Sequence, residues 1–272
     1  MDRGGGGANM EVVVNDPLFD ISGKIIVVTG ACGLIGREIA IAFGSRRARL
    51  VLVDVTEAPL EALGIELSNE TRTMVCDVSD PEKVRRLSSD VIASHGHVDV
   101  LINCHQHKPA GFLDSNAETC SDELWNAVLG ANLNGAFYTC REFGREMIAR
   151  RKGSIINFAS VYGMVSSNPA LYSDNAMGNP VAYSVSKGAV GMMTRYLASY
   201  WGEFGVRVNC LTPHGVFRDH ERAFIDRFSA MVPLKRMMMP GEIIGATLFL
   251  ASEASSFVTG SNVVVDGGWT AW

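Results

Sequence analysis

Short apolar segments alternate with segments of helical spacing along almost the whole chain. Strand-like runs rich in β-branched residues include KIIVVTG from Lys24, RLVLVDV from Arg49, VDVLIN from Val98 and VRVNCLTP from Val206. Amphipathic stretches such as LIGREIAIAFGSR stand between them. Because near-continuous apolar strands need cover on both faces, the alternation predicts an α/β fold with a parallel sheet between helices.

Two helix starts carry clear local signals. Asp80-Pro81 places an N-cap residue before a proline at the first helical position, so we expect a helix to open there. A long amphipathic helix is expected to start at Ser121, with Asp122 and Glu123 in its first turn, and to continue toward Arg150.

The chain is long enough for one large domain of this kind. Its 272 residues contain no internal repeat and no linker that would divide them. We therefore expect a single doubly wound domain over residues 21–272, with about seven strands in its sheet. Residues 1–20 carry a glycine run and no apolar signal core, so we expect a flexible tail there rather than a secretory signal.

Composition and charge exclude several classes of protein. Hydrophobic residues make up 47% and charged residues 19%, which is typical of a globular chain rather than a disordered one. The net charge of −5 argues against a nucleic-acid partner, and no apolar run is long enough to span a membrane. Six cysteines are scattered without a CxxC pair, which predicts reduced thiols in a cytoplasmic enzyme.

The first strand runs directly into a glycine-rich loop, TGACGLIG, at residues 29–36. Glycine allows a tight turn and lets a pyrophosphate approach the backbone, where the following helix presents free N–H groups. A glycine triplet between a strand and a helix predicts a dinucleotide site. We expect the cofactor contacts of this loop to come from Gly30, Cys32, Gly33, Leu34, Ile35 and Gly36.

The second strand ends in a carboxylate, Asp54, that bears on the choice of cofactor. A carboxylate there can accept hydrogen bonds from both hydroxyls of an adenosine ribose, and it would repel a 2′-phosphate. No Lys or Arg directly follows it in DVTEAP, so we expect NAD rather than NADP. The alternative for Asp54 is a helix cap. Asp77, after the third strand, is either an adenine contact or a turn residue. We also expect cofactor contacts from the residue after each aspartate, Val55 and Val78.

Three tyrosines compete for a catalytic role in SVYGMVSSNPALYSDNAMGNPVAYSVSK, residues 160–187. Only Tyr183 has a lysine four positions later, Lys187, whereas Tyr162 and Tyr172 have none. On a helix that spacing places both side chains on one face. A nearby ammonium lowers the pKa of a phenol, so the pair predicts a general base at Tyr183.

Together these motifs resemble the short-chain dehydrogenase/reductase family, in its single-domain Rossmann form. The resemblance runs from about Lys24 to Trp272 and includes TGACGLIG, CDV, NLNGAF, IINFASVYG, YSVSK, VRVNCLTP and VDGGW. It implies hydride transfer between a secondary alcohol and NAD⁺, or the reverse, with no metal. It also implies a homodimer or homotetramer, packed through long helices that start near Ser121 and Val181.

The resemblance carries roles onto matching positions of this chain. Tyr183 would be the general acid/base, and Lys187 would hold the nicotinamide ribose and lower the tyrosine pKa. Ser160 would stabilise the substrate oxygen, and Asn132 would anchor a water linked to Lys187. The segment 212–216 would lie along the nicotinamide. Further cofactor contacts would come from Asn103, Cys104, His105, Pro213, Gly215 and Val216.

The chain departs from the family pattern in three short motifs. Leu34 replaces the middle glycine of the loop, and the resulting GxxGxxG resembles the extended, epimerase-type branch, whose C-terminal substrate domain is not found here. The usual Asn-Asn-Ala-Gly is NCHQH, so His105 and His107 either border the nicotinamide or substrate pocket or lie in a polar loop. A metal site is disfavoured because no fourth ligand lies nearby. His214 interrupts the usual Pro-Gly and brings an imidazole near the cofactor.

The spacing from Ser160 to Tyr183, 23 positions, is longer than in most family members. The extra residues, within 164–180, are polar and include Tyr172, so we expect them to pass over the active-site mouth. The insertion and its SVYG…Y…PVAYSVSK frame loosely resemble oxidoreductases of the flagellin-glycan (legionaminic acid) pathways. That resemblance implies a carbohydrate or sugar-phosphate substrate. The alternative is a surface loop that never touches substrate.

The leading hypothesis is an NAD-dependent alcohol/ketone oxidoreductase acting on a polar, sugar-like substrate. Its substrate contacts are expected from His105, His107, Tyr172 and His214. An enzyme resembling 3-oxoacyl-carrier-protein reductase would favour NADPH, which Asp54 disfavours. Two competing hypotheses are a nucleotide-sugar epimerase or dehydratase and a catalytically silent NAD-binding protein.

Overall fold

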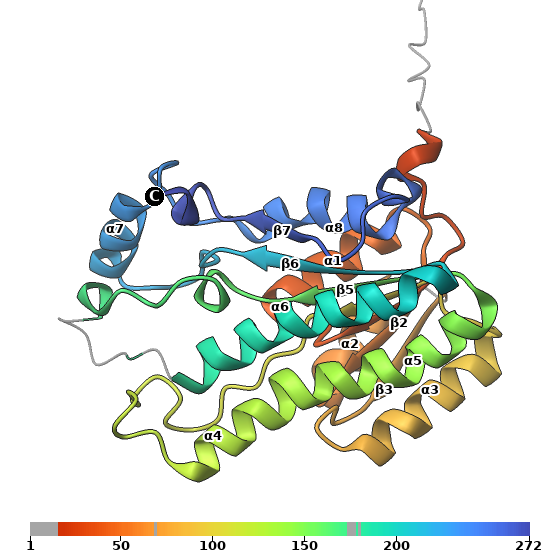
Figure 1. The fold of residues 1–272 in the computed structure, drawn as a ribbon, viewed down its shortest axis with the longest axis horizontal. Helices are drawn as coiled ribbons and strands as arrows, with labels where there is room; N and C mark the ends of the chain where they lie inside the picture. Colours follow the sequence, from red (N-terminus) through yellow and green to blue (C-terminus); the bar gives the residue numbers. More distant parts are fainter. Residues whose placement is uncertain (1–15, 68–69, 173–177, 179–180) are drawn as a thin grey trace, which may run out of the picture.

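All strands of the sheet run parallel, and helices cover both of its faces (Figure 1). The computed structural model describes residues 16–67, 70–172, 178 and 181–272. Within these residues the sheet has seven strands in the order β3-β2-β1-β4-β5-β6-β7, which confirms the predicted doubly wound fold. The strands are β1 (Ile25–Thr29), β2 (Arg49–Asp54), β3 (Thr71–Val75), β4 (Val100–Asn103), β5 (Gly153–Phe158), β6 (Val206–Pro213) and β7 (Asn262–Val265).

The helices occupy the stretches between strands, as the apolar spacing predicts. Helices α1 and α8 pack on one face of the sheet, and α3, α5 and α6 pack on the other (Figure 1). The bounds are α1 (Leu34–Gly44), α2 (Glu57–Leu67), α3 (Pro81–His95), α4 (Asp122–Leu129), α5 (Ala136–Arg150), α6 (Val181–Trp201), α7 (Arg222–Met231) and α8 (Ile244–Ala251).

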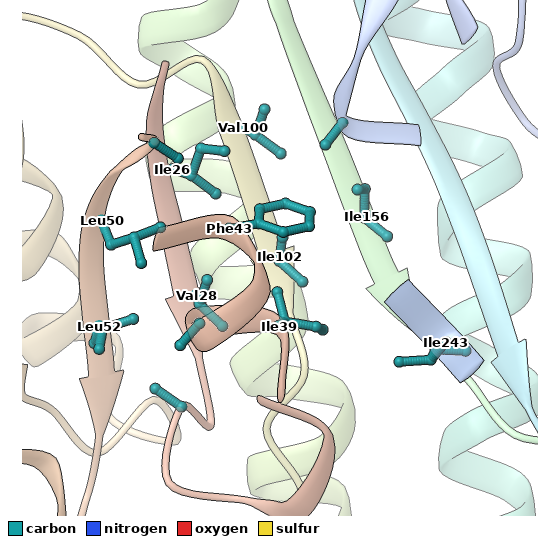
Figure 2. Packing of buried hydrophobic residues seen from close by; sticks show 14 of the residues in the cluster. Ile26, Val28, Ile39, Phe43, Leu50, Leu52, Val100, Ile102, Ile156 and Ile243 are labelled. Carbon is teal, nitrogen blue, oxygen red and sulfur yellow. The ribbon is translucent and has the colours of Figure 1, made fainter. Parts of the chain in front are cut away.

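The two faces of the sheet build two separate cores. Successive residues of a strand point to opposite faces. Ile26 and Val28 of β1 therefore pack with Phe43 of α1 (Figure 2), whereas Val27 belongs to the opposite core with Phe143 of α5. Burial on both faces explains why the central strands β1 and β4 are almost entirely apolar. The cores hold the strand ends, and therefore the site, in a fixed frame.

Helix starts follow the capping residues of the sequence. Asp80 caps α3 by accepting hydrogen bonds from the backbone N–H groups of Glu82 (2.9 Å) and Lys83 (3.2 Å), with Pro81 at the first position. Ser121 caps α4 by accepting from Leu124 N at 3.2 Å. Both starts are confirmed.

The expected continuous helix from Ser121 toward Arg150 is wrong in one respect. A π-helical turn, Gly130–Gly135, separates α4 from α5. A Cβ at Gly135 would lie 2.9 Å from Val78 Cγ2, so this glycine lets the widened turn lie close to the segment after β3. Such turns insert one residue into a helix and are frequent at functional sites. Here the turn contains Asn132.

Two predicted flexible or inserted segments are only partly described. Residues 1–15 of the expected tail lie outside the described residues, while Pro17–Phe19 form a 3₁₀ helix capped by Asp16. Residues 173–177 and 179–180 of the insertion also lie outside the described residues. The described part before them contains a second 3₁₀ helix, Pro169–Leu171, which is followed by Tyr172.

Candidate active site

A cavity of about 590 Å³ lies at the carboxyl ends of the strands. The strand order reverses between β1 and β4, and in such sheets ligands bind in the crevice beside that reversal. Strand ends supply much of the lining, and they place the glycine loop and the Ser/Tyr/Lys set on one cavity. The strand-end residues are Gly30, Asp54, Cys104, Phe158 and Pro213.

The glycine loop has little room for side chains. Gly30 has a φ of +69°, and a Cβ there would lie 2.5 Å from the Cα of His105. A Cβ at Gly36 would collide with the carbonyl oxygen of Gly30. These contacts explain the first and last glycines of the motif as packing requirements of the turn.

The start of α1 fits the phosphates of a dinucleotide. Gly33 is its N-cap and offers no side chain to the first N–H groups of the helix. Leu34, Ile35 and Gly36 open the helix, where N–H groups have no intrahelical acceptor, and all three line the cavity. Free donors at a helix N-terminus are suited to an anion such as a pyrophosphate. Leu34, which stands where the family pattern has a glycine, is 41% exposed and lines the cavity.

Asp54 lines the cavity and also holds the loops around it. One carboxylate oxygen accepts from Cys32 N at 2.9 Å. The other accepts from Val55 N and from Thr56 Oγ1, each at 2.8 Å. Both roles considered for Asp54 are thus compatible, because the carboxylate supports the turn before α2 while lying in the cavity. Thr56 lines the same end of the cavity, although no sequence motif points to it.

Ser160, Tyr183 and Lys187 line the opposite end of the cavity. Ser160 follows β5, and its Oγ accepts from Tyr162 N at 3.2 Å, which starts a 3₁₀ turn. Tyr183 and Lys187 lie one turn apart on α6, as their spacing predicts. The Lys187 ammonium donates to the carbonyl of Phe158 at 2.8 Å and lies 6.0 Å from the centre of the Tyr183 ring.

The titration of this pair differs from the expectation. Burial raises the pKa of Tyr183, and the hydrogen bond with Ser160 offsets only part of that rise. The predicted lowering by Lys187 is therefore wrong for the protein by itself, because burial outweighs the other influences and the ammonium points to a carbonyl. Burial lowers the pKa of Lys187 itself to about 8.

Asn132 lies fully inside the protein, in the π-helical turn. Its Oδ1 accepts from His107 N at 2.8 Å and thereby fixes the loop after β4. Its Nδ2 has no partner among the described residues. A buried amide donor normally has a partner, so this atom is suited to an ordered water. The arrangement agrees with a role in positioning water, which the family resemblance implies.

A pair of tyrosine hydroxyls borders the site. The Oη atoms of Tyr162 and Tyr172 lie 3.0 Å apart, and both side chains line the cavity. Burial raises the pKa of each. Phe112 packs edge-on against Tyr183, with ring centres 6.0 Å apart. The sequence predicts Tyr172 at the substrate, whereas no pattern in it points to Tyr162 or Phe112 as site residues.

The three histidines expected at the substrate divide into two groups. His105 does not line the cavity; its Nδ1 lies 2.7 Å from Thr29 Oγ1, and burial lowers its pKa to about 3. His107 also lies outside the lining and contributes its backbone N–H to Asn132. His214 does line the cavity, against Phe228, and burial lowers its pKa to about 4. Its Nε2 has no partner among the described residues.

Other expected cofactor contacts lie outside the cavity lining. Asn103 donates to Asn157 Oδ1 at 2.9 Å and accepts from Thr139 Oγ1 at 2.8 Å in a buried network at the strand ends. Asp77 accepts from Ser79 N and Ser79 Oγ, as expected of a turn residue. These two residues, together with Val55 and Val78, are not in the cavity lining, whereas Pro213, Gly215 and Val216 are.

Several lining residues carry no sequence signal of their own. They come from the loop after β4, the loop after β6, helix α7 and the segment after α7, which meet only in the folded chain. They are Gln106, Lys108, Leu113, Arg218, His220, Phe224, Phe228 and Met237. Within the described part of the chain, no group of three His, Cys, Asp or Glu side chains could hold a metal. No helix in that part is long and apolar enough to cross a membrane.

Comparison with known proteins agrees with this geometry. Residues 30–270 match a family model described as enoyl-(acyl carrier protein) reductase. Galactitol 2-dehydrogenase (L-tagatose-forming) of Cereibacter sphaeroides is 37% identical over 265 residues, which cover 94% of this chain and 98% of that protein. Other similar proteins are named as dehydrogenases of polyols or sugar acids.

Two solved structures illustrate the similarity of the fold. A short-chain dehydrogenase from Leptospira borgpetersenii with bound NAD⁺ has a TM-score of 0.86 and 28% identity, covering 97% of this chain and 99% of that one. A gluconate 5-dehydrogenase from Burkholderia cenocepacia, in complex with NADP and tartrate, has a TM-score of 0.84 and 28% identity, covering 94% and 98%. Cofactors of both kinds thus occur among similar structures.

Proposed function

Because the chain belongs to the short-chain dehydrogenase/reductase family, we propose that it interconverts a secondary alcohol and a ketone on a polyhydroxylated substrate, with NAD(H) as cofactor. The observation that carries this proposal is the meeting of Ser160, Tyr183 and Lys187 on a cavity that also holds the glycine loop. A nicotinamide cofactor is the common requirement of the family. Beyond that requirement, we propose NAD as the cofactor and a polyhydroxylated molecule as the substrate.

Each polar group of the site has a distinct task in this reaction. A nicotinamide held in this cavity would supply the hydride acceptor for oxidation, or the hydride donor for reduction. Tyr183 Oη takes the hydroxyl proton of the alcohol, while Ser160 Oγ holds the same oxygen as it becomes a carbonyl. In reduction the proton returns from Tyr183 to the oxygen. The Lys187 ammonium can then exchange protons through a water held by Asn132 Nδ2.

NAD is favoured by the carboxylate at the end of β2. Asp54 lies in the cavity on the same side as the glycine loop, with Thr56 beside it. A 2′-phosphate at this point would meet a negative charge, whereas a ribose with free hydroxyls would meet a hydrogen-bond acceptor. Initial rates with NAD⁺ and NADP⁺ test the choice, and a strong preference for NADP⁺ would contradict it.

A polyhydroxylated substrate is favoured by the polar groups beside Tyr183. Tyr162, Tyr172 and His214 line this part of the cavity, and the buried Nε2 of His214 has no partner among the described residues. Such a ligand needs several hydrogen-bond partners inside a mostly apolar pocket. The names of the similar proteins, dehydrogenases of polyols and sugar acids, point the same way.

A substrate panel tests the reaction. Rates with NAD⁺ are compared for alditols, aldonates and simple secondary alcohols, and rates with NADH and NADPH for the corresponding ketoses and for 3-oxoacyl thioesters. The 3-oxoacyl thioesters test the main competing activity, that of an enzyme resembling 3-oxoacyl-carrier-protein reductase. Turnover of thioesters alone would overturn our proposal, whereas turnover of polyols or their acids supports it.

We further propose a homo-oligomer in the cytoplasm. Helix α6 exposes Tyr196 and Tyr200, whose stacked rings lie 4.4 Å apart, together with Met192. Contiguous exposed apolar side chains on one helix are typical of a subunit interface. Light scattering of the purified protein distinguishes a monomer from the dimer or tetramer that we expect.

A further inference from the structure

Positive charge gathers at the substrate end of the cavity. Lys108 comes from the loop after β4, and Arg218 and His220 come from the loop after β6. All three line the cavity together with Tyr183 and Tyr162. These two loops are more than a hundred residues apart in the sequence. The fold therefore brings their basic groups to one wall.

The cavity lining offers Lys108 and Arg218 no opposing charge at this end. Among the described residues that line the cavity, Asp54 is the only carboxylate, and it lies at the glycine-loop end. Lys108 and Arg218 form no ion pair or side-chain hydrogen bond with any described residue. Arg222, four residues after Arg218, instead pairs with Asp226 at 2.9 Å on the surface. The cavity wall thus differs from its surroundings in keeping its cations unpaired.

The cations lie near one another and near the reacting groups. Desolvation, followed by the like charge of Arg218, lowers the pKa of Lys108. The charge of Lys108 is in turn one of the influences that lower the pKa of Lys187. Burial, followed by the charge of Arg218, lowers the pKa of His220. An anion bound at this wall would relieve the repulsion, whereas a neutral ligand would leave it in place.

We propose that the substrate carries an anionic group, a carboxylate or a phosphate, which Lys108 and Arg218 bind while its carbinol lies at Tyr183. The inference rests on the proposed oxidoreductase activity and narrows its substrate class to sugar acids or sugar phosphates. A guanidinium can bind two oxygens of such a group at once, and an ammonium adds a point charge. His214, Tyr162 and Tyr172 would then be available to bind the hydroxyl groups of the substrate.

The cofactor's pyrophosphate is the other anion that could reach this wall. Which anion binds at this wall, the substrate's or the cofactor's, is shown by which KM changes when a cation is removed. If the wall binds the substrate, loss of a cation raises KM for the acid and leaves KM for NAD⁺ unchanged. If it binds the pyrophosphate, KM for NAD⁺ rises with every substrate, neutral or charged.

The test compares neutral and anionic substrates that share a carbon skeleton and differ at one terminal group. Wild-type enzyme, Arg218→Gln, Lys108→Gln and the charge-preserving Arg218→Lys are assayed with galactitol, D-galactonate, D-glucitol, D-gluconate and glucitol 6-phosphate. Arg222→Gln is the control, since it removes an arginine from the same region but outside the cavity lining. The assays are repeated at raised ionic strength, which screens charge–charge attraction.

We expect wild type to prefer an acid over its matched polyol, and Arg218→Gln or Lys108→Gln to lower kcat/KM for the acid by about 10- to 100-fold. The same variants should change kcat/KM for the polyol by less than about threefold, and Arg218→Lys should recover part of the loss. Equal or greater wild-type activity on the polyols overturns this inference and leaves the oxidoreductase proposal standing. Turnover of acyl thioesters alone overturns both. An increase in KM for NAD⁺ with every substrate overturns the inference by assigning the wall to the pyrophosphate.

Discussion

Gly163 packs directly against the backbone of Lys187. A Cβ at Gly163 would lie 2.6 Å from the carbonyl carbon of Lys187 and 2.8 Å from the amide nitrogen of Gly188. Gly163 ends the 3₁₀ turn that Ser160 begins, so this contact sets how closely the serine strand approaches the helix that carries Tyr183. The glycine therefore acts as a spacer between the two halves of the Ser/Tyr/Lys set.

Gly163→Ala should separate these halves. The added methyl meets backbone rather than a movable side chain, so the turn or α6 must shift by part of an ångström. Small displacements of reacting groups are costly, and we expect kcat to fall by about 10- to 100-fold with KM for NAD⁺ little changed. Gly191→Ala is the matched control, because nothing lies within 4 Å of its Cβ position on the same helix. Full activity of Gly163→Ala would contradict the spacer role.

The tyrosines should differ sharply in their importance. Tyr183→Phe removes the general acid/base, and we expect kcat to fall by about 100- to 10,000-fold while NADH still binds, as fluorescence titration would show. Tyr162→Phe removes only the hydroxyl partner of Tyr172, so we expect mainly a rise in substrate KM. Equal losses in the two variants would argue against Tyr183 as the proton carrier.

Local patterns in the sequence predict much of this molecule. The Asp80–Pro81 helix start, the glycine turn and the one-turn spacing from Tyr183 to Lys187 each depend on neighbours along the chain, so their physics is visible in the sequence. The doubly wound parallel sheet needs only the alternation of strands and helices, together with the family resemblance.

Features that depend on distant contacts are not predictable in this way. Which histidine faces the cavity is decided by packing, so His105 turns to Thr29 whereas His214 lies in the lining. Whether the pKa of Tyr183 is raised or lowered depends on burial, which a Tyr-x-x-x-Lys pattern does not reveal. Lys108 and Arg218 carry no motif and become a pair only when their loops meet.

Asp54→Asn should weaken discrimination between the two cofactors. The amide keeps one acceptor for the loop N–H groups but removes the negative charge that a 2′-phosphate would meet. We expect the ratio of kcat/KM for NAD⁺ to that for NADP⁺ to fall by about tenfold, which corresponds to about 1.4 kcal/mol. Asp77→Asn serves as the control because the Asp77 carboxylate accepts hydrogen bonds from Ser79 in its turn and lies outside the cavity lining. An unchanged ratio in Asp54→Asn would remove the charge argument for NAD.

His214 should make the fold sensitive to acid. Burial holds its pKa at about 4, below the usual value of 6.5, so the unfolded chain binds this proton more readily than the folded one. The contribution to stability is complete above pH 6.5 and is lost as the pH falls toward 4, to a total of at most about 3 kcal/mol. His214→Leu fills much of the same apolar space beside Phe228 and Trp269 and cannot be protonated.

The free energy of unfolding of both proteins, measured by urea denaturation at about pH 7 and about pH 4.5, tests this. Wild type should lose about 1 to 3 kcal/mol more than His214→Leu over that interval. Because His105 is also buried and has a lowered pKa, it contributes to the acid sensitivity of both proteins and cancels in the difference. Equal losses would show that the His214 imidazole accepts a proton inside the fold without strain.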